Sequence, residues 1–95
     1  MDPYLTPASR LRADANARES WSDRCDGHAE DYERAGRFDK AQDEYRRSAI
    51  HLREAASILR EAAAVDGGTQ ADLDRADLLT RAAAYTEGWA ADLNG

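Results

Sequence analysis

Residues 38–65 read FDKAQDEYRRSAIHLREAASILREAAAV, a stretch without proline or glycine. Its small and apolar side chains repeat every seven positions, in rows that a helix of 3.6 residues per turn places side by side on one broad face. The three rows are Phe38, Tyr45, Leu52 and Leu59; Ala41, Ser48, Ala55 and Ala62; and Ala49, Ala56 and Ala63. At 1.5 Å per residue this pattern predicts a helix about 42 Å long that needs partner helices on that face. Asp39 followed by Gln42 is typical of a capping box at its start.

A first helix is predicted upstream, over residues 7–35. Thr6 suits the N-cap position and Pro7 the first helical position. Gly27 interrupts the pattern that follows, since an interior glycine costs about 1 kcal/mol relative to alanine. This glycine marks a kink, a close helix contact or a break, and we favour one continuous helix. Residues 1–5 are expected to form a loose N-terminal arm.

A third helix is predicted over residues 70–93. Gly36 and the Gly67-Gly68 pair supply the two turns, because glycine tolerates the left-handed conformation that ends helices. Thr69 and Asp72 have the spacing of a capping box at the start of the third helix. The side chains expected on its buried face are Leu78, Ala82, Tyr85 and Trp89, with Leu73, Ala76, Leu79, Ala83, Ala90 and Leu93 beside them.

Short turns make neighbouring helices antiparallel. The expected fold is therefore all-α, an antiparallel three-helix bundle with long helices that forms a single domain over residues 1–95. In this arrangement Trp89 approaches Tyr45 and is shielded from solvent. One end of the bundle is expected to gather the aromatic side chains of Tyr32, Phe38, Tyr45, Tyr85 and Trp89.

Charge and composition narrow the functional classes. The 95 residues include 19 acidic and 13 basic side chains, for a formal net charge of −6, which argues against nucleic acid as the main partner. The single Cys25 excludes an intramolecular disulfide and suits a reducing compartment. No apolar run approaches the ~18 residues of a membrane span and no signal peptide is visible, so we expect a cytoplasmic protein without a membrane partner. The excess of arginine over lysine, with that of alanine, suggests a GC-rich bacterial or phage source.

The segment AEDYERAGRFDKAQDEYRRS, residues 29–48, resembles two helical families. It looks like a tetratricopeptide hairpin, in which small and aromatic residues let two helices pack across a glycine turn. The long helices and the third helix are more similar to the microtubule-interacting-and-transport (MIT) domain, whose pattern Asp31, Phe38, Ala41 and Tyr45 fit. The resemblance covers about a third of the chain. It implies a three-helix architecture and, by analogy, partner peptides that dock in grooves between helices.

Two residue pairs suggest chemistry. Cys25 and His28 could supply two metal ligands, but a zinc site needs four, so we expect packing roles, no metal and no cofactor. Arg46 and His51 fit the Arg-x(4–6)-His spacing that resembles the HEPN family of helical ribonucleases. In that family the arginine would hold a phosphate and the histidine would serve as acid or base. A five-residue offset turns the two side chains apart on a helix, so a HEPN-like ribonuclease using Arg46 and His51 is an alternative and not the main prediction.

The main prediction is an apolar partner-binding surface. Ile50 lies about 150° from the main face of the central helix, by the rule of 100° per residue. Ile58 and Val65 share a flanking row that either packs in the core or borders the surface. Together with Leu79 of the third helix they are the predicted partner-binding residues. We therefore expect a small non-catalytic protein-interaction module, an adaptor or inhibitor that binds a helical segment of another protein. A homodimer and a self-assembling structural helical protein are further alternatives.

Overall fold

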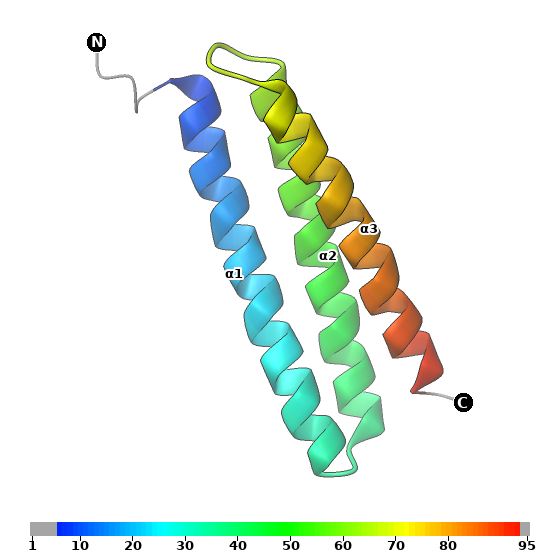
Figure 1. Ribbon diagram of the computed structural model, residues 1–95. Helices are drawn as coiled ribbons and strands as arrows, with labels where there is room; N and C mark the ends of the chain where they lie inside the picture. Colours follow the sequence, from blue (N-terminus) through cyan, green and yellow to red (C-terminus); the bar gives the residue numbers. More distant parts are fainter. Residues whose placement is uncertain (1–5, 94–95) are drawn as a thin grey trace.

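The computed structural model describes residues 6–93, which form three α-helices (Figure 1). They are α1 (Pro7–Arg34), α2 (Phe38–Ala63) and α3 (Gln70–Asp92). Helix α1 packs against α2, and α2 against α3, which confirms the all-α three-helix bundle with α2 at its centre. The predicted bounds differ from the observed ones by no more than two residues at each end. The arm expected over residues 1–5 lies outside the described residues.

The helix ends follow local sequence signals. The Thr6 side chain accepts a hydrogen bond from the Ser9 backbone N–H at 3.1 Å, and Pro7 opens α1 as expected. The capping box of α3 also forms, with the Thr69 backbone N–H donating to Asp72 Oδ2 at 2.9 Å. The two turns contain Gly36 at φ 75° and Gly67 at φ 86°, a left-handed conformation that glycine adopts without strain.

The N-terminal end of α2 and the glycine inside α1 each test a local prediction. Helix α2 begins at Phe38 as predicted, but the capping box expected from Asp39 and Gln42 is wrong, because the N-cap is Arg37 and no side chain caps this end. Gln42 is buried instead and donates from Nε2 to the carbonyl of Ala90 at 2.7 Å, so it joins α2 to α3. Gly27 lies inside one continuous α1, and a side chain added there would meet nothing within 4 Å. This glycine therefore marks neither a break nor a close helix contact.

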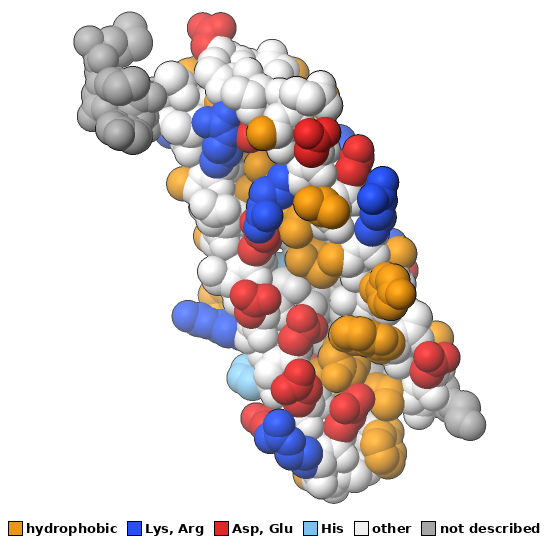
Figure 2. Space-filling model, viewed as in Figure 1, with side chains coloured by type: hydrophobic (Ala, Val, Ile, Leu, Met, Phe, Trp, Pro, Cys, Tyr) orange, Lys and Arg blue, Asp and Glu red, His pale blue; other side chains and the backbone are white. Residues whose placement is uncertain are grey.

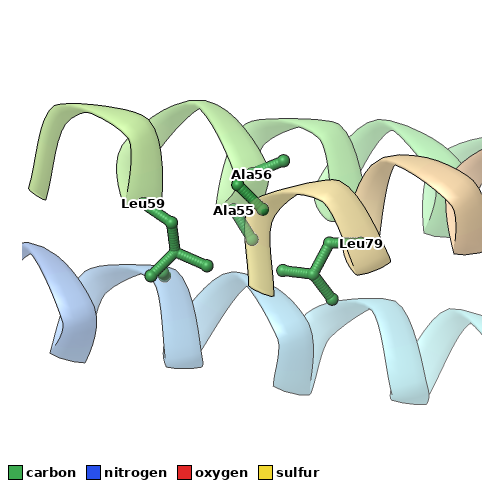
Figure 3. Packing of buried hydrophobic residues seen from close by; sticks show 6 residues of the cluster. Ala55, Ala56, Leu59 and Leu79 are labelled. Atoms are coloured by element: carbon green, nitrogen blue, oxygen red, sulfur yellow. The ribbon is translucent and has the colours of Figure 1, made fainter. Parts of the chain in front are cut away.

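The core is built mainly from alanine with a few large side chains. It consists of two clusters, one with Ala15, Ala55, Ala56, Leu59, Ala76 and Leu79, and one with Ala29, Ala41, Tyr45 and Ala90. Figure 3 shows Leu59 of α2 and Leu79 of α3 pointing into the space that borders α1, next to Ala55 and Ala56. Small side chains let helix axes approach towards the short end of the usual range of about 8–10 Å. The few leucines then fill the gaps between backbones that lie close together.

The buried face of α3 is not centred on the predicted row, although four of the residues expected beside that row are buried, namely Ala76, Leu79, Ala83 and Ala90. The residues of α3 that are buried are Asp72, Ala76, Leu79, Ala83, Thr86 and Ala90, which we call the inner stripe. The side chains of Leu78, Tyr85 and Trp89 are 57%, 72% and 52% exposed. The reason is one of size, since the alanines of the inner stripe let α3 lie close to the alanine-rich face of α2, whereas larger side chains would hold the two helices apart.

The expected aromatic cluster forms only in part. Trp89 does approach Tyr45, with ring centroids 6.1 Å apart in an edge-to-face arrangement, but it is not shielded from solvent. Phe38, expected on the buried face of α2, is 50% exposed at the first position of that helix. Over residues 6–93, no helix is long and apolar enough to cross a membrane.

Candidate functional site

The helices α1 and α3 both pack on α2, and within residues 6–93 their backbones do not come close to each other. A groove of about 470 Å³ lies between them, with Leu52 of α2 and Leu79 of α3 in its lining. We call it the α1–α3 groove. On the face seen in Figure 2, hydrophobic side chains gather in the lower half and acidic side chains border them. The lining of the groove likewise contains both apolar and acidic side chains.

The α3 side of the groove carries the large apolar residues that the fold leaves exposed. Leu78, Ala82, Tyr85 and Trp89 follow one another at spacings of four, three and four residues, which places them on one face of a helix. We call this set the outer stripe. Trp89 contacts Tyr85 edge-to-face, with ring centroids 6.3 Å apart, and Ala82, Tyr85 and Trp89 line the groove. Such a spacing is the pattern by which helices pack on other helices.

The α1 side of the groove is acidic. Glu19, Asp23, Asp26 and Glu30 are also spaced four, three and four residues apart, and the first three line the groove. We call this row the acidic edge. Burial raises the pKa of Asp26, and the charges of Asp23 and Glu30 raise it further, while a hydrogen bond from Ser48 opposes the shift. The Oδ1 atom of Asp26 is shielded from solvent and has no hydrogen-bond partner within the described part of the chain.

Ion pairs join the N-terminal halves of α1 and α3 beside the groove. Arg12 donates from Nε and Nη2 to the two carboxylate oxygens of Asp72 at 2.7 and 2.8 Å, and also to the carbonyl of Gly67 at 2.7 Å. These bonds, helped by the Thr69 backbone N–H, lower the pKa of Asp72 to about 2 despite its burial. Arg75, about one turn after Asp72 on α3, pairs with Glu19 of α1. These contacts hold the two helices at a fixed spacing where the groove begins.

The structure does not bring the four predicted partner-binding residues onto one surface. Leu79 is buried and is the only one of the four that lines the α1–α3 groove. Ile50 is 55% exposed and lies in a separate hollow, beside Arg46. Ile58 packs against the core, and Val65 is 39% exposed in the turn after α2. The signal that sequence reasoning missed is the acidic edge, whose spacing of four, three and four residues matches that of the outer stripe.

The residues considered for chemistry lie elsewhere. Arg46 and His51 line different hollows, so the structure does not bring these two side chains together. His51 stacks on Trp21 with ring centroids 6.4 Å apart, in a hollow that also contains Cys25 and His28. Burial and the charge of Glu44 raise the pKa of the Cys25 thiol, which disfavours the reactive thiolate. In the part of the chain that is described, no three His, Cys, Asp or Glu side chains are placed to hold a metal ion.

Comparison with known proteins assigns no family to this chain. No protein-family model matches it, and no curated protein or solved structure matches it significantly. The likeness to tetratricopeptide hairpins and MIT domains therefore stays a prediction. The inference of function therefore rests on the geometry of the α1–α3 groove.

Proposed function

We propose that this chain is a non-catalytic protein-interaction module that binds a helical segment of a partner protein in the α1–α3 groove. The observation that carries the proposal is the outer stripe, because it leaves Leu78, Tyr85 and Trp89 more than half exposed in one row. Single exposed apolar residues are normal on a protein surface, whereas a contiguous apolar patch marks a site of interaction. The lone, buried Cys25 suits a reducing compartment, and the proposal places the module in the cytoplasm.

The shape of the groove favours a helix as its occupant. A helix laid between α1 and α3, on the side away from α2, would complete a four-helix arrangement with two neighbours already in place. Its apolar side chains would cover Tyr85 and Trp89 and approach Leu52 and Leu79 in the lining. Each aromatic side chain removes about 150–250 Å² of surface from water when it is buried, and aromatic residues dominate the binding energy of many interfaces.

Removing the two aromatic side chains tests the proposal directly. An 18-residue amphipathic peptide with leucines at heptad spacing is titrated into the protein while Trp89 and neighbouring backbone amides are followed by NMR. We expect shifts confined to the α1–α3 groove, and a loss of affinity of about 30-fold or more in the double variant Tyr85→Ser, Trp89→Ser, since hot-spot residues contribute about 2 kcal/mol or more.

The matched control is Ile50→Ser, which removes an equally exposed apolar side chain outside the groove. It should bind the peptide as the wild type does, and circular dichroism should show that both variants stay helical. Equal loss in the control, or shifts around Ile50 in place of the groove, would overturn the assignment of the site.

A further inference from the structure

We propose that the helix bound in the α1–α3 groove is cationic, with a row of Lys or Arg residues that faces the acidic edge and a row of apolar residues that faces the outer stripe. This inference rests on the proposed function and specifies the partner chemistry of the same site. It follows from the unequal charge of the two sides of the groove.

The acidic edge has little basic compensation inside the groove. Arg81 is the one basic residue in the lining among the described residues, and Arg75 is already paired with Glu19. Over residues 6–93, neither Asp23 nor Asp26 has an ion-pair partner. Glu30 continues the row towards its end, where only Arg34 approaches it, at 3.9 Å. Asp23 and Asp26, on adjacent turns, therefore line the groove without an ion-pair partner, and Arg81 is the single opposite charge in the described lining.

Asp26 shows the physical consequence. Its Oδ1 atom is shielded from water and has no hydrogen-bond partner in the described part of the chain, and the bond from Ser48 offsets only part of the cost of burial, because the pKa of Asp26 remains raised. Asp23 and Glu30 add repulsion to this cost. A Lys or Arg side chain entering from the groove would bring the opposite charge to Asp23 and to the accessible part of the Asp26 carboxylate, and charge-assisted bonds are stronger than neutral ones.

A second copy of this chain fits the groove less well. Each copy has a net charge of −6, and α3 itself carries five acidic and two basic residues. An α3 helix from another copy would therefore bring further carboxylates to the acidic edge. Electrostatic complementarity favours a partner of opposite sign, and like charges placed side by side are costly. A cationic amphipathic helix satisfies both sides of the groove at once.

The test uses three 18-residue peptides with one shared apolar row. Their second row, spaced three and four residues apart to match Asp23, Asp26 and Glu30, carries Lys, Gln or Glu. We expect the Lys peptide to bind about tenfold more tightly than the Gln peptide and the Glu peptide to bind weakest, with the difference shrinking as salt is added. The double variant Asp23→Asn, Asp26→Asn should lose the preference for Lys and keep its affinity for the Gln peptide.

The matched control is Asp43→Asn with Glu61→Gln, which removes the same charge from exposed positions on α2 outside the groove lining and should keep the preference for Lys. Equal binding of the Lys and Gln peptides would overturn the cationic partner while the helix-binding function stands. Binding of none of the three peptides would overturn the function itself. A concentration-dependent mass that Tyr85→Ser abolishes would show that a second copy occupies the groove, which overturns the cationic inference.

Discussion

The inner and outer stripes of α3 lie side by side, yet only one of them packs. Leu78 and Leu79 are adjacent in the chain and identical in chemistry, but the first is 57% exposed and the second is 7% exposed. Half of the inner stripe is alanine and its one large apolar residue is Leu79, whereas the outer stripe contains Leu78, Tyr85 and Trp89. Close approach between backbones therefore selected the packed face, at the expense of the larger apolar area that the outer stripe could have buried.

Truncating Leu78 and Leu79 in turn tests whether only the inner stripe packs against the rest of the protein, and this test has the largest expected effect. Leu79→Ala should lower the free energy of unfolding by about 2–4 kcal/mol, because it leaves a cavity between α2 and α3 that the structure fills only in part. Leu78→Ala should lower it by less than about 0.5 kcal/mol, since its side chain stays mostly in water. Urea denaturation of both variants measures the difference. Similar losses would mean that α3 packs with both stripes.

Asp72 is the first residue of the inner stripe. Its ion pair with Arg12 makes the stability of the packed face depend on pH. The pKa of Asp72 is lowered to about 2 in the folded protein, from 3.8 in an unfolded chain. Its contribution to stability is therefore present above about pH 4 and is lost as the pH falls towards 2. Asp72→Asn should reduce the free energy of unfolding by about 1–2 kcal/mol at pH 7, after allowing for the partial exposure of Arg12.

The measurement is thermal or urea unfolding of the wild type and Asp72→Asn between pH 2 and 7. The difference between the two proteins should shrink below pH 4 and nearly vanish at pH 2. Asp31→Asn is the control, because its ion pair with Arg34 is exposed and lies within α1. A difference that stays constant across this range would show that hydrogen bonding and not charge accounts for the effect.

Asp26, on the groove side, should show the opposite pH dependence with the smallest effect. Its pKa is raised in the folded protein, so its ionisation weakens the fold once the pH exceeds the pKa of an ordinary aspartate. Asp26→Asn should therefore raise stability at pH 7 by a few tenths of a kcal/mol, and the gain should disappear in acid. The same unfolding series measures it. A loss of stability at pH 7 would mean that the carboxylate supports the fold through its bond with Ser48.

Much of the fold could be predicted because its signals are local. Thr6, Pro7, Thr69 and Asp72 mark helix starts through contacts within one turn, and they do so in the structure. The glycine turns after α1 and α2 likewise depend on backbone conformation at single positions. The candidate site could not be predicted in the same way. Of the four predicted partner-binding residues, the groove lining contains Leu79 alone.

The sequence by itself determined three helices, their order and their bounds, because period and capping are properties of neighbouring residues. Only the tertiary structure decided which stripe of α3 faces inward. Both stripes repeat at spacings of three and four residues, so the helical period cannot tell them apart. The choice depends on α2 and on bonds between residues far apart in the chain, such as those of Gln42 with Ala90 and Arg12 with Asp72. The α1–α3 groove, with its acidic edge and its outer stripe, is the consequence of that choice.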